Sequence, residues 1–171
     1  GLKVTGGISI QLNGLKVMDV GCGTGKISLS IAKLGAQVAC LDASEGMLSQ
    51  CYQRAVDEGV EKQIKLLHAS ADAIPESDGQ YDLAVSSRFL HLFPVNMYPV
   101  FIEEMLRIVK PKGYVIFEVK NKYAGLGINF KNEWVKKIKG GTPSSSMGTF
   151  EIHQLIKKIG DRKGRVRIVG I

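Results

Sequence analysis

The chain has 171 residues, enough for one compact domain with a hydrophobic core but hardly for two, so we expect a single domain over residues 1–171. Apolar residues make up 44% of the chain and charged residues 23%, and no apolar run approaches the roughly 20 residues that span a bilayer, which argues against a membrane-spanning helix. The net charge of +7 is uneven: residues 1–109 carry 9 Lys and Arg against 12 Asp and Glu, whereas residues 110–171 carry 14 against 4.

The basic last third of the chain has two interpretations. The simpler one is a solvated, lysine-rich face, because scattered surface lysines need no partner. The other is a docking surface for an anionic partner such as RNA, whose phosphates would attract the excess of Lys and Arg. Charge alone leaves both open.

The cysteines and the first residues bear on where the protein works. Cys22, Cys40 and Cys51 are odd in number and lack the CxxC spacing of a metal site, which predicts reduced thiols and neither a disulfide framework nor a zinc site. The opening GLKVTGGISI lacks the basic start, long apolar run and cleavage site of a secretory signal. We therefore expect a cytoplasmic protein without a bound metal.

The first predicted elements are a strand and a helix. Leu15–Val20 is a short apolar run that ends at a glycine cluster, as a buried strand does. In the helix that follows, Ile27, Ile31 and Leu34 share one face, and Gly35 ends the helix.

A second strand and helix come next. Gln37–Leu41 is predicted as a strand that closes on Asp42, and Ser44 is a suitable N-cap for a helix that ends at Gly59. The side chains expected on the buried face of this helix are Met47, Leu48, Cys51 and Ala55.

Two further strands are predicted at Ile64–Leu67 and Asp82–Val85. The polar stretch Asp72–Gln80 between them contains Pro75 and Asp78-Gly79, which indicate a loop.

A helix over Asn96–Val109 and a strand over Tyr114–Val119 follow, with a turn at Pro111–Gly113 between them. The apolar side chains that we expect on one side of this helix are Val100, Phe101, Met105, Ile108 and Val109. Alternating strands and helices with short connections predict a mainly parallel sheet covered by helices. The fold class is therefore α/β.

Residues 120–148 interrupt this alternation. A small amphipathic piece at Phe130–Ile138 and the turn-rich Gly140–Ser146 predict a lid-like insertion. A last helix from Thr149 to Gly160 and a strand at Arg165–Ile171 complete the prediction.

The glycine cluster Gly21–Gly25 lies between the first strand and the first helix, where unhindered backbone can receive a ligand. A dinucleotide-binding GxGxxG motif would need a glycine at Lys26. A phosphate-binding GxxxxGK[ST] loop would need a glycine at Val20 and a hydroxyl residue at Ile27. Neither spacing fits.

The segment Asp19–Gly25 closely resembles the first motif of class I S-adenosylmethionine-dependent methyltransferases, in which an acidic residue precedes GxGxG. The resemblance continues at Asp42, where that family places an acid on the ribose hydroxyls of the cofactor. Asp72 and Ala73 follow the third predicted strand, where the family's acidic residue meets the adenine amine.

Two later segments extend the resemblance, which covers Leu15–Val119. Tyr81–Ser87 is similar to the fourth-strand motif, and Leu106–Tyr114 looks like the turn before the fifth strand, with Lys112 in place of the family's first glycine. The resemblance implies S-adenosylmethionine as cofactor. The residues implied for its site are Asp19, Gly21, Gly23, Gly25, Asp42, Ala43, Asp72, Ala73 and Ser87.

The resemblance also implies a single-domain, Rossmann-like, doubly wound sheet with helices on both faces. The family's sheet normally ends in a seventh, antiparallel strand, whereas this chain stops at Ile171, after the sixth predicted strand. Helices usually precede the family's first strand, and Gly1–Asn13 is too short to supply them. The expectation is therefore a chain truncated or incomplete at its ends, without the last antiparallel strand.

Motifs after the fourth strand restrict the methyl acceptor. No cysteine follows proline, as the nucleophile of cytosine C5 methyltransferases does, and the Asp/Asn-Pro-Pro-Tyr/Phe motif of amino-group nucleic-acid methyltransferases is missing. Ser87–Phe93 is instead similar to the small-molecule branch, which often has a histidine here. His91 is thus a candidate general base for a hydroxyl nucleophile, or else a side chain packed beside the adenosine.

Three more residues are candidates for contact with the substrate. Arg88 could pair with an anionic group of the substrate or with a surface carboxylate. Tyr123 and Trp134 could supply apolar walls for the substrate or belong to a small helix that covers the sheet.

The resulting prediction is a methyltransferase that acts on an oxygen or nitrogen of a small molecule. Two alternatives stay open. One is an RNA or protein methyltransferase that docks through the basic last third, and the other is a non-catalytic module that binds S-adenosylmethionine.

Overall fold

The computed structural model describes residues 12–119. Within them the chain divides into two compact units. The first comprises residues 12–87 with Glu104–Phe117, and the second comprises Arg88–Glu103 with residues 118–119. The expected single domain over residues 1–171 stays a prediction.

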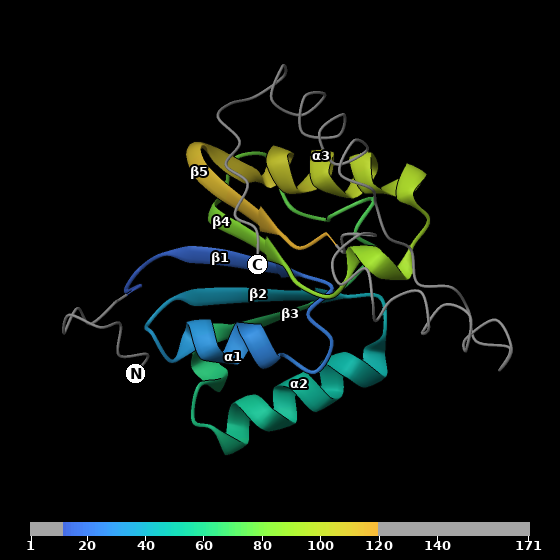
Figure 1. The fold of residues 1–171 in the computed structure, drawn as a ribbon. Coiled ribbons are helices and arrows are strands. Elements are labelled where there is room, and N and C mark those ends of the chain that lie inside the picture. The colour runs from blue at the N-terminus through green and yellow to red at the C-terminus, as the bar shows by residue number, and fades with distance from the viewer. Residues whose placement is uncertain (1–11, 120–171) are drawn as a thin grey trace, which may run out of the picture. The chain divides into compact units, whose positions relative to one another are not determined.

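The first unit is built on a five-stranded sheet (Figure 1) in the order β3-β2-β1-β4-β5. Every neighbouring pair of strands is parallel. The strands are β1 (Lys16–Val20), β2 (Gln37–Asp42), β3 (Ile64–His68), β4 (Tyr81–Ser86) and β5 (Val109–Phe117). The predicted α/β, Rossmann-like fold class is confirmed.

The central strand of the sheet, β1, is buried at every residue except Lys16. In β1, Val17, Met18 and Val20 are all 0% exposed, because a parallel strand in the middle of a sheet is covered on both faces. The strand order reverses at β1, which pairs with β2 on one side and β4 on the other. Open α/β sheets bind ligands outside the carboxyl ends of their strands at such a reversal.

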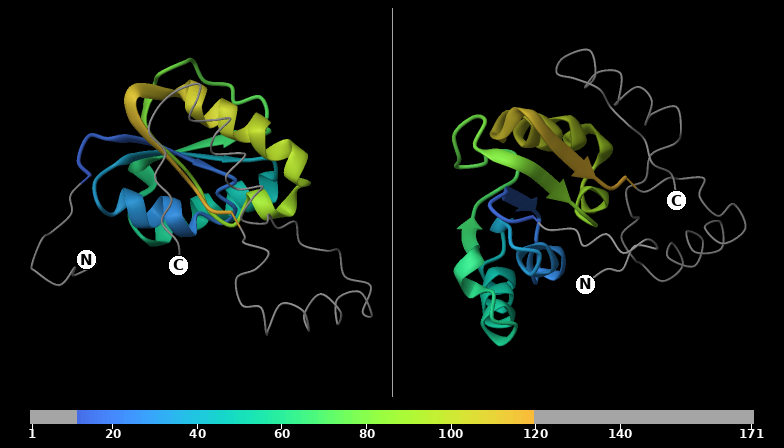
Figure 2. Two further views of the ribbon diagram at one scale, coloured as in Figure 1. Left: turned by 45° about the horizontal axis from the view of Figure 1, so that its top comes forward. Right: turned by 90° about the vertical axis from the view of Figure 1, so that its left-hand side faces the viewer.

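Helices α1 (Lys26–Ala32) and α2 (Glu45–Asp57) lie together on one face of the sheet, as Figures 1 and 2 show. Ile27 and Ile31, predicted on one apolar face of α1, are partly buried and pack against the core, whereas Ser28, Leu29 and Ala32 are buried more fully. The Ser28 hydroxyl donates a hydrogen bond to a carboxylate inside the fold, described below.

Helix α2 begins and ends at the predicted residues. The Ser44 hydroxyl accepts a hydrogen bond from the Met47 amide at 3.3 Å, and Gly59 closes the helix with a φ of 69°. Met47 itself is 42% exposed, so its predicted burial is wrong. The buried stripe is Leu48, Cys51 and Ala55. A short 3₁₀ helix, η1 (Glu61–Gln63), leads into β3.

Helix α3 (Tyr98–Ile108) crosses from the second unit into the first, after the 3₁₀ helices η2 (Leu90–Leu92) and η3 (Val95–Met97). Val100, predicted on its buried side, is 40% exposed. The other side chains predicted there are buried, namely Phe101, Met105, Ile108 and Val109. Within the second unit, the rings of Phe89, Phe93 and Phe101 pack with centroids 4.8–5.3 Å apart.

Strand β5 starts at Val109, directly after α3, and not at Tyr114 as predicted. The expected turn therefore lies inside an irregular strand, whose register against β4 shifts between Tyr81 and Leu83. Gly113 permits this bend, since a Cβ there would lie 2.6 Å from the carbonyl oxygen of Asp82.

Among the described residues, no helix combines the length and the apolar character that a membrane crossing requires. The predicted insertion at residues 120–148, the helix from Thr149 and the strand Arg165–Ile171 lie outside the described residues.

Candidate cofactor site

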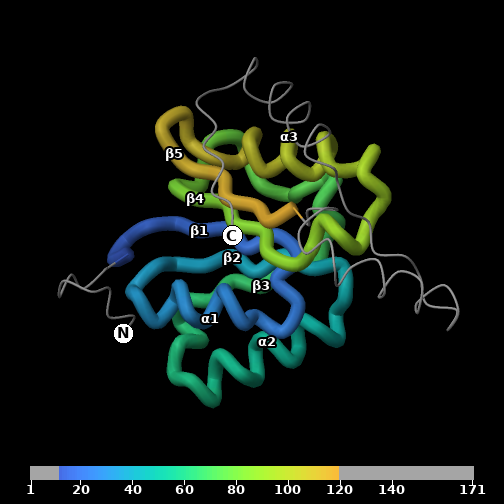
Figure 3. Tube along the Cα trace, viewed as in Figure 1, coloured from blue at the N-terminus to red at the C-terminus, as the bar shows by residue number. Residues whose placement is uncertain are grey.

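The glycine loop, Gly21–Gly25, connects β1 to α1 (Figure 3). Gly21, Gly23 and Gly25 have φ angles of 72°, 54° and 78°, which side chains with a Cβ rarely adopt. The Gly25 amide donates to the Cys22 carbonyl at 3.0 Å and closes a tight turn. A Cβ on Gly25 would also collide with the sulfur of Cys51, so this position requires glycine twice over.

Strand β2 holds the glycine loop through three backbone amides. Gly21 N and Cys22 N both donate to the Leu41 carbonyl, at 2.8 and 3.0 Å. Gly23 N donates to Oδ2 of Asp42 at 2.9 Å. A Cβ on Gly23 would meet no atom within 4 Å, so the space beside its Cα is open.

Asp42 ends β2 and joins the loop to the start of α2. Its Oδ1 accepts from Ser44 N at 2.9 Å, while Oδ2 accepts from Gly23. Ala43, between them, is exposed, and its carbonyl lies 3.0 Å from Nε2 of His68 on β3. The structure therefore brings together the loop and Asp42, which are 19 residues apart in the sequence.

Asp19 supports the glycine loop from inside the fold. It is 2% exposed, and its Oδ2 accepts a hydrogen bond of 2.6 Å from the hydroxyl of Ser28, which is fully buried. Burial raises the pKa of Asp19 to about 6, because the charged form loses hydration, although the Ser28 hydrogen bond lowers it in part. This carboxylate fixes β1 to α1 and does not lie at the exposed edge with Asp42.

A chain of charged groups that the sequence did not predict holds the loop from α2. Nη1 of Arg54 donates to the Thr24 carbonyl at 2.9 Å, and Nη2 donates to Glu58 at 3.3 Å. Glu58 also pairs with Lys33 at 2.8 Å. No local pattern signals this contact, because Arg54 is 30 residues from Thr24.

Asp72 and Ala73 lie after β3, as predicted, and both are exposed. Ala73 N donates to Ser70 O at 3.3 Å in a turn. The next residue, Ile74, is buried and fixes the segment, with its amide donating to Glu104 at 2.9 Å. The Asp72 carboxylate thus stands on an anchored turn beyond the end of β3.

The carboxyl ends of β4 and β1 are joined by a buried hydrogen bond. The Ser86 hydroxyl donates to the Val20 carbonyl at 2.9 Å. Ser87, the predicted cofactor residue, follows directly and is partly buried. Ser86 was not predicted as a site residue. Its hydrogen bond fixes the end of β4 next to β1, where the strand order reverses, and Ser87 follows there.

The four predicted substrate residues lie outside the described part of the first unit. Arg88, which is exposed and has a φ of 57°, and His91, in η2, belong to the second unit. Tyr123 and Trp134 lie outside the described residues. The roles of all four stay predictions.

Comparisons with known proteins show the family of this chain. Residues 17–113 match a family model described as a methyltransferase domain. Ubiquinone biosynthesis O-methyltransferase of Shewanella pealeana is 38% identical over 110 residues, which cover 64% of this chain and 45% of that protein. Demethylmenaquinone methyltransferase of Bacillus subtilis is 37% identical over 106 residues, covering 60% and 44%. The chain spans about half the length of these relatives.

A solved structure supports the fold. Magnesium protoporphyrin IX methyltransferase from Synechocystis PCC 6803, crystallised with SAH, has a TM-score of 0.70 at 24% identity, over 86% of this chain and 64% of that one. The family match covers more than half of the chain and includes the whole glycine loop and Asp42. The chain therefore belongs to the class I S-adenosylmethionine-dependent methyltransferases.

Proposed function

We propose that this chain binds S-adenosylmethionine and transfers its methyl group to an oxygen or nitrogen nucleophile of a small molecule. The observation that carries the proposal is the 2.9 Å hydrogen bond from Gly23 to Asp42, which joins the open glycine loop to a carboxylate at the ends of the strands. The relatives named for ubiquinone and demethylmenaquinone support a small-molecule acceptor of that kind.

The residues at this edge fit the cofactor. Each Asp42 oxygen accepts one backbone N–H, and because a carboxylate oxygen has two lone pairs, each retains an acceptor for one hydroxyl of the ribose cis-diol. The open space at Gly23 lets a ligand approach the backbone without meeting a side chain. The exposed Asp72 would accept from the adenine amine.

Bound S-adenosylmethionine supplies an electrophilic methyl carbon next to its sulfonium. No covalent intermediate with the protein is required, so the chain has to align the nucleophile with that carbon and exclude water. Asp42 would orient the ribose, and the Asp19–Ser28 pair would hold the loop in place from behind. Asp19 is therefore a positioning residue in this proposal.

Calorimetry with S-adenosylmethionine and S-adenosylhomocysteine tests the site at Asp42. We expect Asp42→Ala to weaken binding of both at least about tenfold, because a charged acceptor of two hydroxyls is lost. Asp57→Ala is the matched control, since Asp57 is an exposed carboxylate of α2 that bonds only Gln53 among the described residues. Its affinity should equal that of the wild type.

Two outcomes of this titration would count against the proposal. Failure of the wild type to bind either ligand would overturn the cofactor site as a whole. Tight binding by Asp42→Ala would refute only the contact with the ribose.

His91 is proposed as the general base. An imidazole titrates near neutrality, and such bases usually contribute about 10²–10⁴-fold to the rate. We expect His91→Ala to reduce turnover at least tenfold with an unchanged affinity for S-adenosylmethionine, measured on whichever phenol, catechol or amine of an acceptor panel the wild type methylates. A loss of less than tenfold would remove His91 as the base and favour packing beside the adenosine.

The same assay separates the alternative functions. Methyl-labelled cofactor incubated with cell extract should label the small-molecule fraction under this proposal. Label in RNA or protein would favour the second candidate, and binding without any transfer would favour a non-catalytic module. A cytoplasmic location is part of the proposal and is supported by the three cysteines, which are free thiols.

A further inference from the structure

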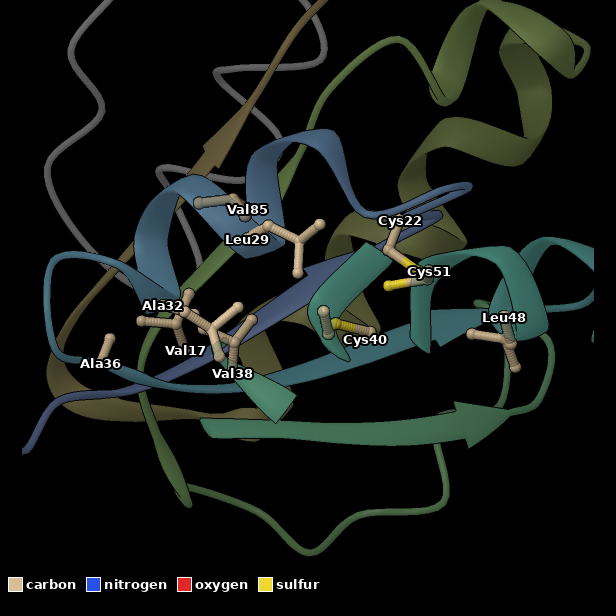
Figure 4. Packing of buried hydrophobic residues seen from close by; sticks show 12 residues of the cluster. Val17, Cys22, Leu29, Ala32, Ala36, Val38, Cys40, Leu48, Cys51 and Val85 are labelled. Carbon is tan, nitrogen blue, oxygen red and sulfur yellow. The ribbon is translucent and has the colours of Figure 1, made fainter. Parts of the chain in front are cut away.

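The three cysteines of the chain meet in the interior of the first unit, although they come from three different elements. Cys22 lies in the glycine loop, Cys40 in β2 and Cys51 in α2. Their sulfur atoms all lie within 4.8 Å of one another. Figure 4 shows the three side chains gathered where these elements meet.

The three sulfurs are enclosed, with the buried Asp19 and Ser28 as polar neighbours. Cys40 and Cys51 are 0% exposed and Cys22 is 9% exposed. The buried cluster around them contains Leu29 and Leu48. Cys22 is the one of the three that solvent reaches, so an ion would enter the group past this residue of the glycine loop.

The spacing of the sulfurs suits a three-coordinate metal ion. Metal–sulfur bonds of about 2.3 Å in a trigonal arrangement place the sulfurs roughly 4 Å apart. Side-chain rotations that move each sulfur by less than about 1 Å would bring the three atoms to this spacing. Among residues 12–119, no imidazole or carboxylate belongs to this group of donors. Three soft donors without a hard one select soft ions over Mg²⁺ or Ca²⁺.

The charge balance favours a divalent ion. Three thiolates around a monovalent ion would leave two buried negative charges, whereas a divalent ion leaves one, and each uncompensated buried charge is costly. Binding is a simple exchange: each thiol loses its proton to solvent, three metal–sulfur bonds form and the ion gives up its water ligands. No oxidant or reductant takes part.

We propose that Cys22, Cys40 and Cys51 form a three-thiolate binding site for a soft divalent metal ion, which ties the glycine loop to β2 and α2. This inference is independent of the proposed methyl transfer. It departs from the expectation of no bound metal, which rested on the missing CxxC spacing.

Titration of the metal-free wild type with Cd²⁺ tests the site, in a reductant that contains no thiol. We expect a thiolate-to-metal charge-transfer absorption that saturates at one ion per chain, with release of about three protons in weak buffer. X-ray absorption of the Zn²⁺ form should show only sulfur neighbours from the protein, at about 2.3 Å. Absence of the charge-transfer band in the wild type would overturn the proposal.

Variants assign the ligands. Cys40→Ala and Cys51→Ala should each weaken Cd²⁺ binding by more than the roughly 100-fold that loss of a supporting contact can cost, because a direct ligand is removed. His68→Gln is the control, since it removes an exposed imidazole of β3 that lies outside the group of three sulfurs. Its Cd²⁺ affinity should equal that of the wild type. Unchanged Cd²⁺ affinity in a folded Cys51→Ala variant would refute the three-thiolate site.

Alkylation of the wild type gives a readout that needs no variant to fold. Under mild denaturation, bound Cd²⁺ should protect all three cysteines from iodoacetamide, as counted by mass spectrometry. Equal labelling with and without Cd²⁺ would contradict the proposal.

Discussion

Asp19 and Asp42 are carboxylates of neighbouring strands that the fold places in opposite surroundings. Asp19 is buried with one hydroxyl donor, and burial raises its pKa to about 6. Asp42 is partly buried and accepts two backbone amides at the open edge of the sheet. The first suits a structural role behind the glycine loop, and the second suits contact with a ligand.

The raised pKa of Asp19 predicts a pH dependence of stability. Its pKa of about 6 in the folded state exceeds the ordinary value of 3.8, so the folded state binds more protons than the unfolded state between these values. Stability from this group is therefore greatest at low pH and is lost as pH rises through about 6. The full effect is about 3 kcal/mol, at 1.4 kcal/mol per pKa unit.

Urea unfolding of Asp19→Asn against the wild type measures this effect. We expect the free energy of unfolding of the variant, relative to that of the wild type, to rise by up to about 3 kcal/mol between pH 4 and pH 7. Asp57→Asn, which removes an exposed carboxylate of α2, is the control and should show no such trend. A difference for Asp19→Asn that stays constant with pH would contradict the burial argument.

At the scale of elements, the end of α3 holds the loop that leaves β3. The guanidinium of Arg107 donates to the carbonyls of Ile74 and Glu76, at 2.8 and 2.7 Å, and to the carboxylates of Asp78 and Glu104, at 2.9 and 2.8 Å. Its hydrogen bonds also hold the pKa of Glu104 below the usual value. The arginine of the motif at residues 106–114 thus anchors the segment that carries Asp72.

Replacing Arg107 should loosen this loop. We expect Arg107→Ala to lower the free energy of unfolding by about 2–4 kcal/mol, because two loop carbonyls and Glu104 lose their donor. Hydrogen exchange of the amides at residues 74–79 should increase. Asp78→Ala is the control, since its side chain in the same loop is 80% exposed and its ion pair with Arg107 is worth about 0–1 kcal/mol. Equal costs for the two variants would disprove the anchoring role.

At the scale of the whole molecule, the charge separates along the chain. Residues 110–171 carry 14 Lys and Arg against 4 Asp and Glu, and most of this segment lies outside the described residues. The proposed small-molecule acceptor gives the segment no nucleic-acid role. A solvated basic face is therefore the expectation.

RNA binding tests this expectation. We expect no measurable affinity for single-stranded RNA at 50 mM salt, because a solvated face docks no phosphates. Filter binding between 50 and 200 mM salt measures it. Binding at 50 mM salt that falls steeply by 200 mM would instead favour the RNA methyltransferase, because contacts with phosphates release counterions.

The sequence by itself determined the alternation of strands and helices and the order of the glycine loop, Asp42 and Asp72 along β1, β2 and β3. These features depend on local patterns: short apolar runs, an N-cap at Ser44, and a motif whose glycines adopt positive φ. The errors in the predicted burial of helix residues were also small shifts along the sequence. Met47 and Val100 lie one position away from the buried face of their helices, a difference that periodicity resolves poorly.

Only the tertiary structure decided which distant residues meet. The contact of Arg54 with Thr24 and the grouping of Cys22, Cys40 and Cys51 join residues from separate elements. Sequence spacing cannot predict such meetings, because they depend on how α2 packs over β2 and the glycine loop. The hydrogen bond of Ser28 in α1 to the buried Asp19 in β1 is a further meeting of this kind. The glycine motif could therefore be predicted from the sequence, whereas the groups that hold it in place could not.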